Sequence, residues 1–230
     1  MKRRSILEID LSKLESNYRR IASAVAPCKV ISVLKADAYG LGAKAYAKAL
    51  YRLGCRDFAV ADPVEAQEMA GVFGYSKDVC IQILSSVLPE EIAEMVSLDV
   101  VLPVVDFESA AMISSEAVSA GKNARVQFKL DAGMGRLGVR TEDAIAVLKK
   151  VSRLPNIDIE GAFSHFPNAT KSECGRTEEQ IAKFKKFLSQ SGEEGLTFRK
   201  IHIAASDAIN NFPETATSPF NFVRAGLDLH

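Results

Sequence analysis

Eight short apolar segments recur along the chain, and segments with helical patterning separate them. The eight are expected to be strands: Lys29–Leu34, Asp57–Ala61, Cys80–Leu84, Val100–Val105, Arg125–Leu130, Ile157–Phe163, Lys200–Ala204 and Phe222–Leu229. Helices are predicted between them, the clearest being Ala43–Leu53, Phe107–Ala120, Thr141–Val151 and Thr177–Gln190. Eight such units are too many for a small doubly wound sheet, and they match another α/β fold, the (β/α)8 TIM barrel. Functional side chains of that fold gather at the C-terminal ends of the strands.

Polar residues stand at the starts of several predicted helices. Asp106 precedes the second of the four helices, and Thr141 is expected to cap the third. Near the N-terminus, Ser12-x-x-Glu15 is a capping box that predicts the start of a further helix. The segment just before it, Leu7–Leu11, is predicted as an extra strand outside the barrel. Because no linker or repeat divides the sequence, residues 1–230 are expected to form one domain.

The charge and composition exclude several classes of function. Lysine plus arginine and aspartate plus glutamate number 29 each, which leaves no electrostatic footprint for nucleic acid or a membrane surface. The basic start, Met1–Arg4, runs into acidic residues, so no signal peptide is predicted, and no segment reaches transmembrane length. The four cysteines contain no Cys-x-x-Cys pair, and the three histidines are not at metal-ligand spacing. A cytoplasmic protein without a metal site is therefore expected.

One lysine, Lys35, stands where the apolar run 30–34 gives way to the glycine-bearing segment Ala36–Gly42. A lysine is seldom placed at the end of a buried strand without a partner, because desolvating its charge is costly. Burial would lower the pKa of the amine, and a neutral lysine can form a Schiff base. The alternative is a lysine whose long side chain simply reaches solvent beyond the strand end.

Further polar residues and a glycine fall at the ends of the predicted strands. They are Tyr39 after the first strand, Lys129 and Arg136 at the fifth, His165 at the sixth, Ser206 and Asp207 after the seventh, and Arg224 with Gly226 in the eighth. Taken singly, His165 could be a core histidine, Arg136 the partner of Asp131 in a loop ion pair, and Ser206 a helix cap. Their convergence on one face of the barrel favours a functional site, with an anion held near the last two strands.

The segment Gly133–Gly138 formally matches the G-x-G-x-x-G pattern of dinucleotide-binding proteins. In that fingerprint the glycines open a helix directly, and an acidic residue follows about twenty residues later. Here the next helix is predicted to begin only at Thr141. The nicotinamide interpretation is therefore the weaker one.

Taken together, these segments resemble the alanine racemases, enzymes that use pyridoxal 5'-phosphate (PLP) to interconvert L-alanine and D-alanine. Val33–Gly40 is similar to the PLP-lysine motif of the family, and Lys129–Gly138 is similar to its second signature. Three shorter motifs follow in the family's order: Ser164-His165-Phe166, His202–Ser206 and Val223–Gly226. The resemblance covers essentially the whole chain.

The resemblance implies a role for each residue of the predicted site. Lys35 would hold PLP as an aldimine and move the α-proton on one face of the substrate. The other implied assignments are Tyr39, Ser206, Gly226 and Leu227 at the phosphate, His165 beside the pyridine ring, Arg136 at the substrate carboxylate and the cofactor's phenolic oxygen, and Lys129 as a position that is often carbamylated.

Arg224 would face the pyridine nitrogen, where most PLP enzymes place a carboxylate. A guanidinium is always charged and can only donate hydrogen bonds, so it disfavours protonation of that nitrogen and weakens the ring as an electron sink. When the ring is a weaker electron sink, the carbanion stays at Cα and is reprotonated there with fewer side reactions, which suits racemisation.

Racemisation also needs a second acid/base on the opposite face of Cα. In the family this is a tyrosine of a C-terminal β-domain, donated across a homodimer interface, and none of the five tyrosines of this chain matches it. We therefore expect the barrel part of an alanine racemase that supplies D-alanine for peptidoglycan, and we expect this part alone to racemise poorly. Two alternatives stay open: a single-domain protein that binds PLP without turnover, and a racemase for another amino acid.

Overall fold

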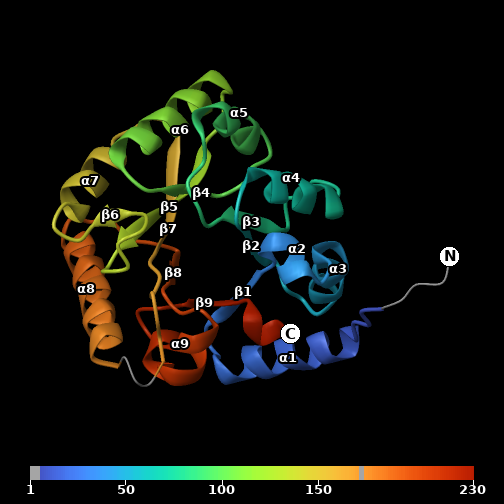
Figure 1. The fold of residues 1–230 in the computed structure, drawn as a ribbon. Helices are drawn as coiled ribbons and strands as arrows, with labels where there is room; N and C mark the ends of the chain where they lie inside the picture. Colours follow the sequence, from blue (N-terminus) through green and yellow to red (C-terminus); the bar gives the residue numbers. More distant parts are fainter. Residues whose placement is uncertain (1–5, 171–173) are drawn as a thin grey trace.

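Parallel strands form a ring, and helices surround it on the outside (Figure 1). The computed structural model describes residues 6–170 and 174–230, so the basic start at Met1–Arg4 lies outside the described residues. All eight predicted strands form: β1 (Lys29–Val33), β2 (Asp57–Val60), β3 (Cys80–Ile83), β4 (Leu102–Val104), β5 (Ala124–Asp131), β7 (Ile157–Phe163), β8 (Lys200–His202) and β9 (Phe222–Ala225). The two-residue β6 (Val139–Arg140) pairs with the end of β5 and is not part of the ring.

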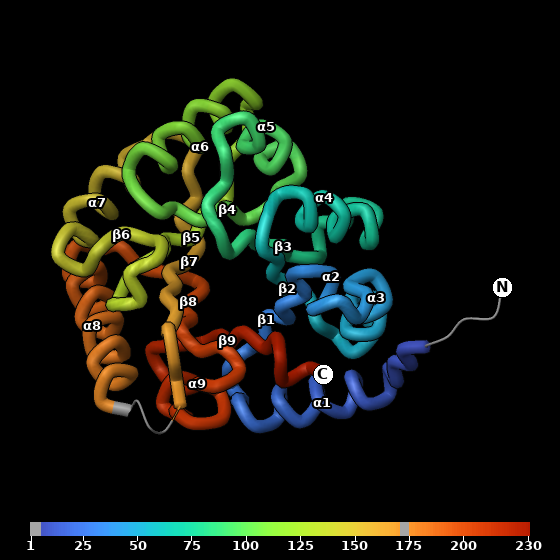
Figure 2. Tube along the Cα trace, viewed as in Figure 1, coloured from blue at the N-terminus to red at the C-terminus, as the bar shows by residue number. Residues whose placement is uncertain are grey.

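The ring consists of two arcs of paired strands that backbone hydrogen bonds join at both seams. One arc has the order β3-β2-β1-β9, and the other has the order β4-β5-β7-β8. At the first seam, Val101 N donates to Ile81 O over 2.9 Å. At the second seam, Arg224 N donates to Ala204 O over 3.1 Å. The strands therefore close into the predicted barrel, as the Cα trace shows (Figure 2).

The outer helices follow the strands in chain order. They are α1 (Leu11–Ala24), α3 (Ala43–Arg52), α4 (Pro63–Val72), α5 (Pro89–Ser97), α6 (Phe107–Ser119), α7 (Ala144–Val151), α8 (Cys174–Glu193) and the short α9 (Ser206–Asn211), with 3-10 turns η2 (Pro213–Ala216) and η3 (Leu227–Leu229). The predicted cap of α6 is confirmed, because Asp106 Oδ1 accepts a hydrogen bond from Ser109 N over 2.7 Å. Across the described ranges, no helix combines the length and the apolar character that crossing a bilayer requires.

Two predictions near the N-terminus are wrong. Leu7–Leu11 forms no strand outside the barrel, because residues 7–10 pair with no other strand among the described residues and Leu11 already begins a helix. Helix α1 begins at Leu11, and its cap is Asp10 rather than Ser12. The Asp10 carboxylate accepts from the backbone N–H of Ser12 over 2.9 Å, which satisfies a donor that the helix itself leaves free.

Predicted boundaries also shift at many elements, and two of these shifts affect the interpretation of the site. Thr141 does not cap α7: residues 141–143 form a turn, and the helix begins at Ala144 after Asp143. The last strand ends at Ala225 instead of Leu229. Gly226 breaks the strand there with φ −127° and ψ −85°, and the chain continues as a 3-10 turn.

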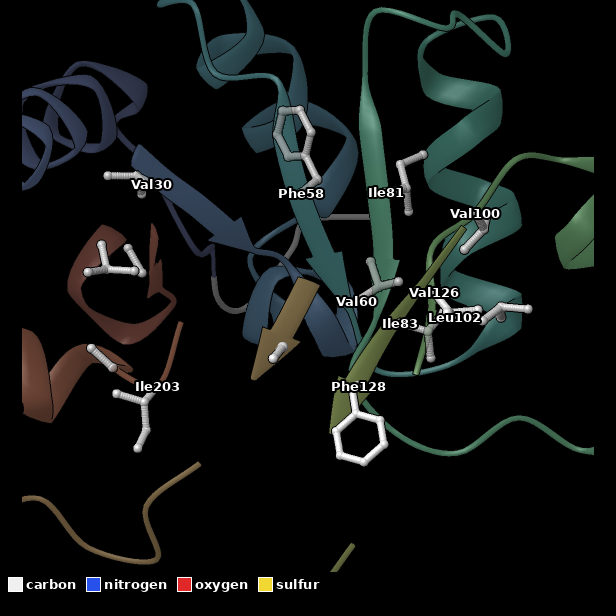
Figure 3. Packing of buried hydrophobic residues seen from close by; sticks show 14 of the residues in the cluster. Val30, Phe58, Val60, Ile81, Ile83, Val100, Leu102, Val126, Phe128 and Ile203 are labelled. Carbon is white, nitrogen blue, oxygen red and sulfur yellow. The ribbon is translucent and has the colours of Figure 1, made fainter. Parts of the chain in front are cut away.

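Side chains alternate between the two faces of the barrel wall. The outward-facing apolar residues pack under the helices and form the main core, as Phe58, Ile83 and Phe128 do (Figure 3). A smaller apolar cluster of Ile31, Val33, Ala59 and Phe222 packs separately from it. The buried polar residues, which alternate with outward-facing ones on their strands, include Gln82, Gln127, Glu160, His202 and Arg224. The barrel interior is therefore polar through much of its height.

The segment α2 (Lys35–Gly40), directly after β1, is a left-handed turn rather than an ordinary helix. Ala36, Asp37, Ala38 and Tyr39 have φ between 51° and 57°, a conformation that costs residues with a Cβ atom about 1–2 kcal/mol each. Sequence patterning gives no sign of such a turn, because none of the four residues is glycine. The turn begins at Lys35, which lies just beyond β1 at the C-terminal mouth of the barrel.

Candidate functional site

A cavity of about 290 Å³ opens at the C-terminal ends of the strands. All nine residues of the predicted site line it: Lys35, Tyr39, Lys129, Arg136, His165, Ser206, Arg224, Gly226 and Leu227. They come from positions that are up to about 190 residues apart, and only the closure of the barrel brings them together.

Lys35 is exposed, so of the two alternatives that the sequence left open, burial at the strand end is wrong and a side chain that reaches solvent is confirmed. The physical reason is that β1 ends at Val33, so Lys35 lies two residues beyond the strand, at the cavity mouth where the left-handed turn begins. Its Nζ lies 5.9 Å from the centre of the Tyr39 ring. An exposed primary amine beside an aromatic ring is free to react with a carbonyl compound that enters the cavity.

Tyr39, Ser206 and Gly226 form one corner of the cavity. Ser206 Oγ accepts from the backbone N–H groups of Gly226 (3.4 Å) and Asp228 (3.2 Å), which leaves its own proton free to donate. A Cβ atom on Gly226 would lie only 2.3 Å from the Tyr39 hydroxyl, so only glycine permits this close approach. Ser206 is the first residue of α9 and not its cap, which is Ala205. Two hydroxyl groups that can donate hydrogen bonds in one corner of the cavity suit a bound phosphate.

Arg224 is 3% exposed and is held by several acceptors in the barrel interior. Its Nη2 donates to Ser164 O and Ile203 O, each over 2.9 Å. Its Nη1 lies 2.6 Å from His202 Nδ1. Burial lowers the pKa of Arg224 to about 10, so the guanidinium remains charged at neutral pH. Arg224 is thus a permanently charged hydrogen-bond donor held in the cavity wall.

The two nearby histidines are both neutral at pH 7. Burial first, and then the Arg224 and Arg136 charges, lower the pKa of His165 to about 3. Burial and Arg224 also hold the pKa of His202 well below its usual value. Because an arginine can only donate, His202 Nδ1 accepts from it, and Nε2–H therefore donates to Gln127 Oε1 over 2.8 Å. His202 links the site to the polar interior of the barrel.

Lys129 is buried in the wall of the same cavity. Its residue is 5% exposed, and its Nζ donates to Leu84 O over 2.6 Å. Burial, and then the positive charges of Arg224 and Arg136, lower its pKa to about 7. A substantial fraction of this lysine is therefore a neutral amine at physiological pH.

Replacing Lys129 by methionine is expected to change how stability depends on pH. Because the folded-state pKa lies near 7 and the usual value is 10.5, the unfolded chain binds more protons between these values. Stability therefore gains a contribution as pH rises from about 7 to about 10, and Lys129→Met removes it. Urea unfolding of both proteins at pH 7 and pH 9.5 measures this difference. The exposed Lys48 supplies the control Lys48→Met, and an equal pH slope in wild type and Lys129→Met would contradict the expectation.

Arg136 sits on the exposed loop 131–138 and lines the cavity mouth. No ion pair joins it to Asp131 among the side chains that the structure describes. The Asp131 carboxylate instead accepts from Gly133 N (2.9 Å) and Gly135 N (3.0 Å) and so shapes the loop. Helix α7 begins only at Ala144, so the glycines do not open a helix, and the dinucleotide interpretation is not supported.

The cavity also has lining residues that the sequence did not single out, among them Val33, Leu84, Phe163 and Asn168. The Phe163 ring centre lies 5.0 Å from Lys129 Nζ and 5.9 Å from Arg224 Cζ, so this aromatic ring lies close to both nitrogen-bearing side chains. Phe163 is the last residue of β7, and its place at a strand end is the signal that could have identified it. Leu84 directly follows β3 in the same way.

The fold and the site define a TIM-barrel domain with an exposed lysine and a corner of two hydroxyl groups at its C-terminal mouth. A family model described as the N-terminal domain of alanine racemase matches residues 9–230. The chain therefore belongs to the alanine racemase family, whose members are PLP-dependent.

Individual relatives agree with this family. The alanine racemase of Methanococcus maripaludis is 36% identical over 228 residues, which are 97% of this chain and 59% of the relative. The alanine racemase of Desulforamulus reducens is 34% identical with the same two shares. The chain thus spans about 59% of the length of these relatives.

Solved structures match the fold at similar coverage. An alanine racemase from Clostridium difficile 630 superposes with a TM-score of 0.90 at 30% identity, over 96% of this chain and 57% of that one. The Bartonella henselae alanine racemase, whose structure has covalently bound pyridoxal phosphate, gives a TM-score of 0.82 at 27% identity, over 96% and 59%.

Proposed function

We propose that this domain binds PLP covalently through Lys35 and forms the cofactor-binding part of an enzyme that interconverts L-alanine and D-alanine. One observation carries the proposal. The exposed amine of Lys35 and the hydroxyl corner of Tyr39 and Ser206 line the same 290 Å³ cavity. A lysine that binds an aldehyde and donors that bind a phosphate are the two features that PLP requires.

The residues present fit that cofactor. The close approach of Tyr39 to Gly226 leaves no room for a Cβ atom, and the free proton of Ser206 can donate to a phosphate oxygen. Bound PLP supplies an electron-withdrawing ring that makes the Cα–H of an attached amino acid acidic. Arg224 would donate to the ring nitrogen and, being charged, keep that nitrogen unprotonated. His165 stays neutral beside it, and Arg136 at the cavity mouth would attract the substrate carboxylate.

Lys35 is proposed as the group that removes and returns the α-proton on one face of the substrate. Racemisation needs a second acid/base on the other face, and we propose that it comes from the part of the enzyme that lies beyond the matched region of the relatives. As in the family pattern, the whole enzyme is proposed to be a cytoplasmic homodimer in which the partner donates this group. Its product would be D-alanine for peptidoglycan. Lys129 is proposed as a site of carbamylation, because its neutral amine can react with carbon dioxide.

Because Lys35 serves only one face of the substrate Cα, the proposal predicts what this chain does without the second acid/base. The chain with PLP is incubated separately with L-alanine and D-alanine in D2O, and α-deuterium and configuration are measured by mass spectrometry and chiral chromatography. We expect one enantiomer to exchange its α-proton with retained configuration, because Lys35 works from one face, while inversion is slow by comparison. Absence of exchange with both enantiomers, despite bound PLP, would favour a PLP-binding protein without turnover. Rapid inversion would show that the chain already holds both bases.

A further inference from the structure

The turn that carries Lys35 needs support from outside itself. Ala36 to Tyr39 adopt left-handed backbone conformations that residues with a Cβ atom avoid. Its far end is held by Asp37, whose backbone oxygen accepts from Gly42 N over 2.9 Å and whose carboxylate accepts from Ala43 N over 2.7 Å. Its near end begins at the Lys35–Ala36 peptide, and the N–H of that peptide is bonded to a side chain from another element.

That side chain is Glu65 in the first turn of α4. Its Oε1 accepts from Ala36 N over 2.5 Å, and its Oε2 accepts from Ala61 N over 2.7 Å. Ala61 directly follows β2, so one carboxylate joins the loops after two neighbouring strands. The backbone of Glu65 is itself fixed, because its N–H donates to the cap residue Asp62 over 3.0 Å.

The sequence Asp62-Pro63-Val64-Glu65 has the form of a capping box. The acidic residue of such a box usually returns to the backbone N–H of its own cap residue. Here the Glu65 carboxylate reaches one residue further back, to Ala61, and across to Ala36 on the next loop. A local helix-start motif is thus used to hold a segment from a different strand.

We propose that Glu65 is a positioning residue for Lys35: its carboxylate fixes the Lys35–Ala36 peptide against the end of β2 and so sets where the lysine amine lies. The role of Lys35 rests on the proposed function. A carboxylate is required because both of its partners are N–H donors and an ionised carboxyl group only accepts. In Glu65→Gln the amide NH2 faces one of these N–H groups, so one of the two hydrogen bonds is lost. Because Tyr39 belongs to the same turn, its hydroxyl in the corner with Ser206 is expected to move together with the Lys35 amine in this variant.

The test compares Glu65→Gln with Glu68→Gln, which alters an exposed glutamate one turn along the same helix. Backbone amide exchange in the PLP-free chain is followed by NMR at Ala36 and Ala61, with Val30 in β1 as the reference for the barrel. We expect exchange at Ala36 or Ala61 to become about tenfold faster in Glu65→Gln, as for loss of one charge-assisted hydrogen bond. Val30 is expected to stay unchanged, and Glu68→Gln is expected to match wild type at all three positions.

A second readout is the rate at which PLP becomes fixed to Lys35 by borohydride reduction, measured by peptide mapping. Glu65→Gln is expected to slow this labelling about tenfold, because a loosened turn presents the amine less often in the reactive geometry. Unchanged amide exchange at Ala36 and Ala61 would overturn the inference, and so would equal acceleration at Val30, which indicates global loosening. If wild type itself is not labelled at Lys35, the proposed function fails, and the amide exchange alone then decides the role of Glu65.

Discussion

Replacing Lys35 by alanine is expected to reduce covalent attachment of PLP to background. The variant and the wild type are mixed with PLP, their visible absorbance is recorded, and the products are reduced with borohydride and mapped by mass spectrometry. Wild type is expected to carry one pyridoxyl group on Lys35. The variant is expected to lose both the absorbance band and the label, because no other amine lies at the open mouth of the cavity beside the Tyr39 hydroxyl corner within the described residues.

The informative competitor is Lys129, the second lysine that lines the cavity. Its pKa of about 7 leaves a substantial fraction of its amine neutral at neutral pH, and only a neutral amine can attack an aldehyde. Geometry opposes its reaction, because Lys129 is 5% exposed and its Nζ is bonded to Leu84 O. A label on Lys129 in the wild type would therefore contradict the assignment of Lys35. The control Lys44→Ala alters an exposed lysine of α3 outside the cavity and should leave the label in place.

Replacing Gly138 by alanine is expected to cost about 3 kcal/mol or more of the free energy of unfolding. Gly138 has φ +121°, which an L-residue with a Cβ atom rarely adopts. The added Cβ atom would also lie 2.7 Å from Lys129 O and 3.0 Å from Asp131 N, both in the rigid backbone of β5. Neither atom can move without disturbing the strand that carries Lys129. Urea unfolding of the two proteins measures the loss.

Gly135 supplies the matched control within the same loop. Its φ is +73°, but a Cβ atom there would meet nothing within 4 Å. Gly135→Ala is therefore expected to cost only about 1 kcal/mol, which is the cost of a left-handed conformation alone. Equal losses for Gly135→Ala and Gly138→Ala would show that the close approach to β5 contributes nothing.

Sequence patterning identified the strands because the barrel wall alternates between two environments. Outward positions such as Val126 and Phe128 are apolar and pack under the helices. The same pattern placed most strand ends within two residues, although it extended the last strand too far. It also led to the prediction that polar residues at the strand ends form one site. The pattern failed at Leu7–Leu11, where an apolar segment has no strand edge to pair with among the described residues.

The sequence alone was enough to predict which residues stand at the strand ends and therefore which side chains form the candidate site. Lys35, Tyr39, Ser206 and Arg224 follow from the residue pattern, since chemistry resides in side chains and the fold class fixes where strand ends meet. Only the tertiary structure decided that Lys35 is exposed on a left-handed turn, that Glu65 holds this turn, and that closure of the barrel surrounds Arg224 with carbonyl groups and histidines. The physical reason is that these properties depend on contacts between segments far apart in sequence. Local propensity does not predict such contacts, and at Ala36–Tyr39 it predicts the opposite conformation.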